Sequence, residues 1–445
     1  MYKNLSKIKY WGDNLYRLEI FPASYGDSIL VTCLGRKKTH ILIDMGFDST
    51  YKKHIKKRLL EINEEGDKLD LLILTHVDDD HISGALSFFK ENNSYSKPNI
   101  ISVEEIWFNS FRHLQFQKKQ IDISKREEIL TQNKNQKLLE RIQKKARPTE
   151  QGQRSGNNIS TNKGSTLASL FYFYDYIKIW NSKFQGNAIM IKERADTQES
   201  AKINSVTLNE EVEIILLSPS KNKLKKLDHL WSEKLLSTGF EGPISRKSIM
   251  DDAFEMLLAN INSSDPKKRE IYKIASTDIE NIIKLSKEDL ETDHSIINGS
   301  SIAFILTFNK KRTLFLADAH MDVVIDQLQQ VCVDEGTEQL HFDAIKISHH
   351  GSKYNTSNEF LELVTSDKYI FSTNGKGSTH PDIETIFKII TSNNKRKKTL
   401  VFNYKPLHIF RIIDKKDLKE KFNYEIIFSN DLSSHVDKLV TTLDI

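Results

Sequence analysis

The chain has 445 residues with a formal net charge of +4, a hydrophobic content of 38% and a charged content of 28%. No stretch approaches the roughly 18–20 uninterrupted apolar residues of a membrane span, and the first residues lack the apolar segment of a signal peptide. We therefore expect a cytoplasmic protein without a membrane partner. The small net charge argues against a strongly basic nucleic-acid binder over the whole molecule. The length allows one large domain with insertions, or two domains.

Short apolar strands open the chain. Strand-like alternation over 15–21, 28–33 and 39–44 predicts an antiparallel start. Helical spacing of apolar residues follows over 50–65, then a strand at 70–74, a helix over 82–91 and a strand over 101–109. The cysteines, Cys33 and Cys332, each lie among apolar neighbours, which predicts buried free thiols in a reducing compartment.

Residues 112–165 break this pattern. They contain thirteen Lys and Arg against five Asp and Glu, a local excess of +8, so the rest of the chain carries about −4. The composition predicts a mostly helical insertion that continues to about 182. Two interpretations stay open for its basic face: phosphate contacts to nucleic acid, or an ordinary solvated surface. The candidate phosphate contacts are Lys118, Lys119, Lys144, Lys145 and Arg147.

Two imidazoles and three carboxylates follow the strand at 70–74, in His76-Val77-Asp78-Asp79-Asp80-His81. Side chains placed just past the end of a strand can converge on one point. This mixture of nitrogen and oxygen ligands suits Zn²⁺, Mn²⁺ or Fe²⁺. The alternative for such a stretch taken by itself is a solvated acidic turn.

Later strands end in further residues of the same kinds. Asp318 follows the apolar run 314–317, and His349 and His350 follow the strand-like 345–347. His380 precedes Pro381 in a loop. An isolated Asp318 would suit a helix cap, and an isolated His380 an ordinary loop. The ordered series favours a metal site instead, in which two adjacent ions could activate a water as a hydroxide nucleophile for hydrolysis.

The motif Thr75-His76-x-Asp78-x-Asp80-His81-x-x-Gly84 resembles the metal-binding signature of the metallo-β-lactamase-fold hydrolases, whose usual form is HxHxDH. Asp78 stands where the second His normally stands, and this variant resembles the nuclease-like domain of ComEC-type competence proteins. Further segments resemble the family in the expected order: 26–30, 41–46, 298–306, 314–318, 348–352 and 372–381. The resemblance implies a four-layer αββα sandwich, here with a large helical insertion.

The resemblance also implies a domain plan and a cofactor. It divides the chain into a first half of the fold (1–110), a basic helical insertion (111–209), a strand of the sandwich (210–220), a second helical, charged segment (221–294) and the second half (295–445). The implied cofactor is Zn²⁺ with two sites, with Mn²⁺ as the alternative because Asp78 makes one site more oxygen-rich.

Site roles follow from the resemblance residue by residue. The implied metal ligands are His76, Asp78, Asp80, His81, Asp318, His349 or His350, and His380. Asp80 and His380 are the catalytic candidates, with His380 either a ligand or a proton donor. Asp44 and Ser352 would hold the ligating side chains in position through hydrogen bonds. Lys353, Asn374 and Lys376 would contact substrate phosphate. The family's third-motif His has three candidates without a recognisable motif, namely His113, His229 and His294.

The predicted function is a metal-dependent hydrolase, with cleavage of nucleic-acid phosphodiesters as the leading activity. Two alternatives are retained. One is a hydrolase of a small nucleotide, ester or lactone, and the other is a subunit that acts only with a protein partner from the same operon, as in a bacterial defence system. The oligomeric state is left open.

Overall fold

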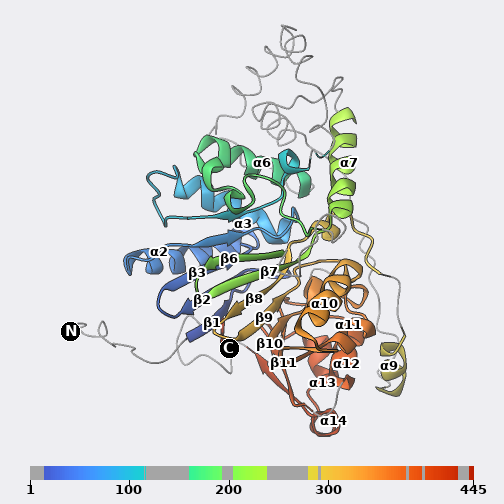
Figure 1. The fold of residues 1–445 in the computed structure, drawn as a ribbon. Coiled ribbons are helices and arrows are strands. Elements are labelled where there is room, and N and C mark those ends of the chain that lie inside the picture. Colours follow the sequence, from blue (N-terminus) through green and yellow to red (C-terminus); the bar gives the residue numbers. More distant parts are fainter. Residues whose placement is uncertain are drawn as a thin grey trace, which may run out of the picture.

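The structure is a computed structural model that describes residues 15–114, 116, 160–192, 204–237, 279–288, 292–376, 380–392, 396–428 and 440–445. Two β-sheets pack face to face, and helices cover the outer face of each (Figure 1). The predicted αββα order of layers is therefore confirmed. The basic residues at 118–147 lie outside the described residues.

The first sheet has six strands. The predicted antiparallel start is confirmed, because β1 pairs with β2 and β2 with β3 in antiparallel register, whereas β4 and β5 continue in parallel. The end of the chain returns to this sheet and pairs with β1. In spatial order the strands are β14 (Thr441–Asp444), β1 (Leu15–Ile20), β2 (Ile29–Leu34), β3 (Lys38–Ile43), β4 (Leu71–Ile73) and β5 (Ile106–Trp107).

The second sheet has eight strands. Strands β9 to β13 run parallel to one another, and β6 to β9 are antiparallel. In spatial order they are β13 (Tyr424–Phe428), β12 (Lys398–Phe402), β11 (Val364–Phe371), β10 (Leu340–Lys346), β9 (Lys311–Phe315), β8 (Ala303–Phe308), β7 (Val212–Ser218) and β6 (Ser205–Asn209). The sequence placed 205–209 in the insertion, and the structure has it as an edge strand of this sheet.

Three buried apolar clusters separate the layers. One fills the space between the sheets, with Val31 and Ile73 from the first sheet facing Phe304 and Val401 from the second. Another lies between the first sheet and its helices, which are α1 (Asp48–Thr50), η1 (Tyr51–Ile55), α2 (Lys56–Glu64), α3 (Asp79–Asn92) and α6 (Ser160–Phe173). The third lies between the second sheet and α9 (Ile279–Ser286), α10 (Met321–Glu335), α11 (Asn358–Leu363), α12 (Ile383–Thr391), α13 (Leu407–Ile413) and α14 (Lys416–Phe422).

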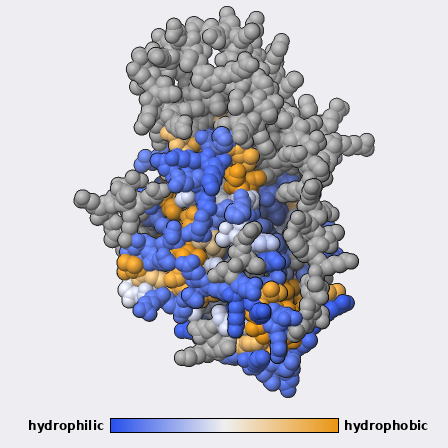
Figure 2. Space-filling model, turned by 90° about the vertical axis from the view of Figure 1, so that its right-hand side faces the viewer, coloured by the Kyte–Doolittle hydropathy of each residue, from blue (hydrophilic) through white to orange (hydrophobic). Residues whose placement is uncertain are grey.

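The remaining helical segments are the helix α7 (Lys221–Ser237) and several short turns of 3₁₀-helix. Helix α7 buries Leu224, Leu227 and Trp231 in the cluster of the first sheet's helices. The others are η2 (Phe111–His113), η5 (Tyr176–Ile179), η6 (Ser182–Phe184), η9 (Asn298–Ser300), η10 (Ser348–Gly351) and η11 (Lys353–Asn355). Among the described residues, no helix is long and apolar enough to cross a membrane. The face drawn in Figure 2 is mostly hydrophilic with small, separate hydrophobic patches.

Candidate metal centre

The stretch that follows β4 divides between a loop and the first turn of α3. Asp78 caps the helix, and its Oδ1 accepts a hydrogen bond from the Asp79 backbone N–H at 2.9 Å. Asp80 and His81 therefore lie on the first helical turn, whereas the sequence predicted that the helix would begin at residue 82. The helix starts this early because an Asp cap and acidic first-turn residues stabilise a helix N-terminus.

Asp318 lies at the middle of four imidazoles. Its Oδ2 is 3.8 Å from Nε2 of His76 and 3.8 Å from Nε2 of His349. Its Oδ1 is 3.6 Å from Nε2 of His81 and 3.9 Å from Nε2 of His350. Each oxygen of one carboxylate thus faces a different pair of histidines, one member of each pair from the first half of the chain and one from the second.

The adjacent His349 and His350 both point at Asp318, although the sequence suggested that one of them would pack elsewhere. Both have left-handed backbone conformations, with φ of 46° and 56°. A non-glycine residue rarely takes this conformation, and two in succession let neighbouring side chains face the same point. His349 faces the Asp318 oxygen that is also near His76.

The opposite nitrogen of each imidazole meets a hydrogen-bond acceptor. Nδ1 of His81 is 2.7 Å from Oδ2 of Asp44, and Nδ1 of His76 is 3.0 Å from Oγ1 of Thr75. Thr75 in turn donates its hydroxyl to the same Asp44 oxygen at 2.8 Å. In the second half, Nδ1 of His350 is 2.9 Å from the Ser372 carbonyl oxygen, and Nδ1 of His349 is 3.0 Å from Oδ1 of Asn355.

This hydrogen-bond pattern assigns the tautomers. In the neutral form with the proton on Nδ1, each of the four rings has the lone pair of Nε2 directed towards Asp318. Metal-ligating histidines commonly donate their other ring N–H to a carboxylate or carbonyl in this way. Asp44 and Thr75 therefore orient His81 and His76, as predicted for Asp44.

The buried polar atoms fit divalent metal ions. Nε2 of His76, His81 and His350 and Oδ1 of Asp318 are buried and make no hydrogen bond to any described residue. Such atoms are costly to bury unless something binds them. The ligand atoms of Asp27, His81, Asp318 and His350 all lie within 4.8 Å of one another, and Oδ2 of Asp80 is 3.6 Å from Nε2 of His350.

Asp27 was not among the predicted ligands. It follows Gly26 between β1 and β2, and its Oδ1 is buried without a hydrogen bond to the described residues. Its Oδ2 is 2.7 Å from Nζ of Lys346, a buried lysine at the end of β10. A Cβ on Gly26 would lie 1.9 Å from the Asp80 carbonyl oxygen, so only glycine allows this close approach. The pattern Gly26-Asp27 was a sequence signal, but it indicated a hairpin and not a ligand.

The protonation of each histidine in this centre depends on the carboxylates beside it. Burial opposes protonation of His350, but the Asp27 and Asp318 carboxylates outweigh it and raise the pKa of His350 to about 10. Burial likewise opposes protonation of His349, whose pKa Asp318 and Asp293 raise to about 9. The imidazoles overcome the burial of Asp318 and hold the pKa of its carboxyl well below the usual range. These two protonated imidazoles would have to lose a proton each before a metal ion could bind in their place.

His380 lies at the edge of the centre. Its ring centroid is 5.1 Å from that of His349, and its Nδ1 is 3.3 Å from Oδ2 of Asp382. Burial lowers the pKa of His380 despite Asp382. Lys353 holds the same Asp382 through its backbone N–H at 2.8 Å, and its Nζ is 3.3 Å from Oε1 of Glu384. Lys353 and His380 are therefore joined through Asp382.

Other predicted residues have structural contacts. Ser352 donates its backbone N–H to the His349 carbonyl at 2.9 Å, and its hydroxyl oxygen accepts from the Tyr354 N–H. Asn374 binds Ser24 through its backbone N–H and its side chain, and accepts the Lys376 N–H at 2.9 Å. Of the third-motif candidates, His113 is buried beside Trp180, and His229 and His294 are exposed. None of the three faces Asp318 among the contacts of the described residues.

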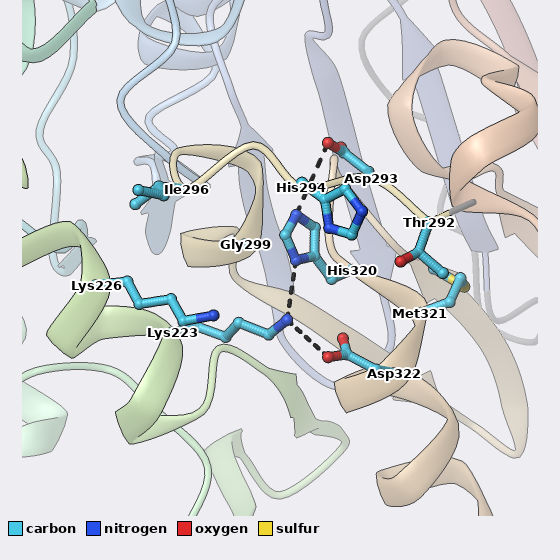
Figure 3. Close-up of a pocket in the computed structure, with 10 residues that line it drawn as sticks. All are labelled: Lys223, Lys226, Thr292, Asp293, His294, Ile296, Gly299, His320, Met321 and Asp322. Carbon is cyan, nitrogen blue, oxygen red and sulfur yellow. Dashed lines mark hydrogen bonds and ion pairs between the residues drawn. The ribbon is translucent and has the colours of Figure 1, made fainter.

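Asp293, His320 and Lys223 are among the residues that line a cavity of about 240 Å³ (Figure 3). Asp293 is the residue that connects this cavity to the centre, because its Oδ2 is 3.5 Å from Nδ1 of His349. The other oxygen of Asp293, Oδ1, is 3.9 Å from Nε2 of His320. Nδ1 of the same His320 ring is 3.0 Å from Nζ of Lys223. The cavity is therefore separated from the centre by Asp293 and one imidazole.

Comparison with known proteins gives one family match. Residues 22–129 match the model of the Metallo-beta-lactamase superfamily, a range that includes β2 to β5 and the stretch from His76 to His81. Residues 22–129 are thus similar to this superfamily, and the layers of the structure have the corresponding fold. No curated protein matches. A solved structure of a long form RNase Z from yeast is similar at 11% identity and a TM-score of 0.34. The alignment covers 94% of this chain and 47% of that one, so this chain spans about half of its length.

Proposed function

We propose that this protein is a metal-dependent hydrolase that cleaves phosphodiester bonds of nucleic acid. The observation that carries the proposal is the position of Asp318 between two pairs of imidazole Nε2 atoms, at 3.6 to 3.9 Å. A carboxylate that offers one oxygen to each of two ligand groups is suited to join two adjacent divalent ions.

The ligands form two groups. His76, His349 and the Oδ2 of Asp318 would hold one ion, with Asp78 as the neighbouring carboxylate. His81, His350, Asp80 and the Oδ1 of Asp318 would hold the other, with Asp27 as an additional oxygen ligand. Bound divalent ions would supply Lewis-acid activation of water and neutralisation of charge at phosphorus. The oxygen-rich second group accommodates Mn²⁺ as well as Zn²⁺.

The chain's own residues would orient ligands and move protons. Asp44 fixes His81 directly and His76 through Thr75, which restricts both rings to one tautomer. His380, beside His349 and backed by Asp382, is placed to transfer a proton at the edge of the centre. We assign it this role and not ligation, because it makes no recorded approach to Asp318 in the described part of the chain.

The choice of a phosphodiester substrate rests on the residues around the centre. His349 is 26% exposed, so the centre opens to the surface on that side. Lys353, Lys223 and Lys226 lie near this opening, where they could bind substrate phosphates. The basic insertion and the likeness of the His76–His81 stretch to ComEC-type proteins point the same way. A small-molecule hydrolase and a partner-dependent subunit are the alternatives.

Purified protein supplemented with Mn²⁺ or Zn²⁺ tests the proposal. Hydrolysis would be measured on single-stranded DNA, double-stranded DNA, RNA and bis(p-nitrophenyl) phosphate, with Asp318→Asn as the inactive control. We expect cleavage of at least one nucleic acid that Asp318→Asn abolishes. Turnover of the small diester without cleavage of any nucleic acid would favour the small-molecule alternative, and activity that requires an added protein would favour the partner-dependent one.

A further inference from the structure

The cavity beside the centre is formed by three separate segments. These are the first turns of α7, residues 292–299, and the start of α10 (Figure 3). A Cβ on Gly299 would lie 2.9 Å from Cε1 of His320 and 3.4 Å from Cδ of Lys223. A side chain at position 299 would therefore displace His320, whereas the distance to Lys223 is an ordinary van der Waals contact.

The carboxylates in the cavity wall are already neutralised by neighbours. Oδ2 of Asp322 is 2.7 Å from Nζ of Lys223. Asp293 accepts hydrogen bonds from the Ser295 backbone N–H at 2.8 Å, from Asn298 Nδ2 at 2.7 Å and from Asn355 Nδ2 at 3.1 Å. These contacts leave neither carboxylate as a strong acceptor for an incoming cation, so the wall is not an acidic site.

Three groups in the wall are hydrogen-bond donors without a recorded partner among the described residues. They are the Lys226 ammonium, the His294 ring and the Thr292 hydroxyl. Figure 3 shows the Lys226 side chain extending from α7 alongside Lys223 towards His320. An ammonium with hydroxyl and imidazole donors around a small polar cavity matches an oxyanion such as phosphate.

The position of the cavity relates it to the metal centre. Asp293 lies between the cavity and Nδ1 of His349, and Nε2 of His349 is 3.8 Å from Asp318. An anion in the cavity would therefore sit on the His76 and His349 side of the centre. A polynucleotide whose scissile phosphate is at the centre carries further phosphates a short distance along the strand.

We propose that this cavity, the Lys226 pocket, binds a phosphate of the nucleic-acid substrate that flanks the scissile one. The inference rests on the proposed function and adds to it a position on the protein that the flanking strand would contact. It separates polynucleotide substrates from single small diesters, because only the former carry a second phosphate.

The chain offers a matched control on the same helix. Lys225 is an exposed neighbour of Lys226 that does not line the pocket. Metal-loaded wild type, Lys226→Gln, Lys226→Arg and Lys225→Gln would be compared for binding of a labelled phosphorothioate oligonucleotide over a salt series, and for KM and kcat on the natural oligonucleotide. Lys226→Gln and Lys225→Gln remove the same charge from adjacent positions.

We expect Lys226→Gln to weaken oligonucleotide binding by about tenfold, because a hydrogen bond to a charged group contributes roughly that factor. The slope of log affinity against log salt should fall by about 0.7–0.9, and KM should rise more than kcat falls. Lys226→Arg should retain most of the affinity and Lys225→Gln nearly all of it.

Equal losses for Lys226→Gln and Lys225→Gln would overturn the pocket, because general surface charge would then explain both. Failure of the wild type to bind the oligonucleotide would overturn it as well. The proposed function has a separate outcome: cleavage of nucleic acid with no effect of Lys226→Gln refutes the pocket alone, whereas absence of cleavage by metal-loaded protein refutes the function.

Discussion

Oδ2 of Asp44 is 2.7 Å from Nδ1 of His81, and both residues are buried. The same oxygen accepts the Thr75 hydroxyl, which is 3.0 Å from Nδ1 of His76. One carboxylate thus sets the orientation of two imidazoles, one from each of the two ligand groups around Asp318. Asp44 has a φ of 55°, a conformation that Asn also tolerates, so Asp44→Asn alters the charge with little change of backbone strain.

Asp44→Asn should weaken metal binding by about 10- to 100-fold, the range found when the hydrogen-bond partner of a ligating histidine is removed. An amide cannot accept from His81 and Thr75 as a carboxylate does. Metal affinity measured by competition with a chelator checks this. Thr75→Val, which removes only the link to His76, should have a smaller effect, and equal affinity of Asp44→Asn and wild type would show that Asp44 does not support the ligands.

Asp80→Ala combined with His81→Ala should lower hydrolysis by at least about 100-fold while the protein stays folded. Both residues lie on the first turn of α3, where His81 faces Asp318 and Asp80 faces His350. Neither belongs to the buried apolar clusters, so their loss removes ligand atoms and not apolar core contacts. Turnover on any confirmed substrate and the circular dichroism spectrum would be measured together. Asp79→Asn on the same turn is the matched control, and near-wild-type turnover of the double variant would refute the site.

Asp27 and Lys346 form a buried pair at 2.7 Å, so removing one partner alone should be costly. Lys346→Met should destabilise the metal-free protein by roughly 3–5 kcal/mol, because it leaves the buried Asp27 carboxylate without its lysine partner. The double variant with Asp27→Asn should recover part of this loss, as a denaturant-unfolding cycle would measure. The double variant should also bind less metal than wild type. Additive losses without any change in metal binding would remove Asp27 from the centre.

Metal binding should release protons and strengthen as the pH rises. In the metal-free protein the pKa values of His349 and His350 are about 9 and 10, so at pH 7 both rings are protonated and cannot bind metal. Loading at pH 7 should therefore release about two protons from these rings, and affinity should increase until the pH passes the higher of the two values, about 10. Calorimetric titration in buffers of different ionisation enthalpy measures the release. Heats that are independent of the buffer would contradict it.

The basic insertion gives a prediction about nucleic acid that does not depend on the described structure. If residues 112–165 contact a polyanion, neutralising Lys118, Lys119, Lys144, Lys145 and Arg147 should weaken binding and reduce its salt slope by roughly 0.7–0.9 for each lost phosphate contact. Hydrolysis of a small chromogenic diester reports separately on the centre. Unchanged binding over a salt series would make the basic excess a solvated surface.

The sequence was informative wherever local pattern determines structure. Apolar runs of four to six residues predicted β1 to β4, and their polar ends identified His76, His81 and Asp318. The sequence did not predict that His349 and His350 would both face Asp318. Two consecutive left-handed residues depend on the backbone path after β10, and such a path leaves no periodic pattern in the sequence. Asp27 was missed because its approach to the centre depends on packing against Asp80. The Lys226 pocket brings together segments about 70 and 100 residues apart, which no local pattern relates.

Anomalous diffraction from crystals grown with Mn²⁺ or Zn²⁺ tests the central claim most directly. The account predicts two peaks, one on each side of the Asp318 carboxylate. The first would lie near Nε2 of His76 and His349, and the second near Nε2 of His81 and His350. A folded protein without any peak between these side chains, at saturating metal, would contradict the metal centre and the hydrolase function built on it.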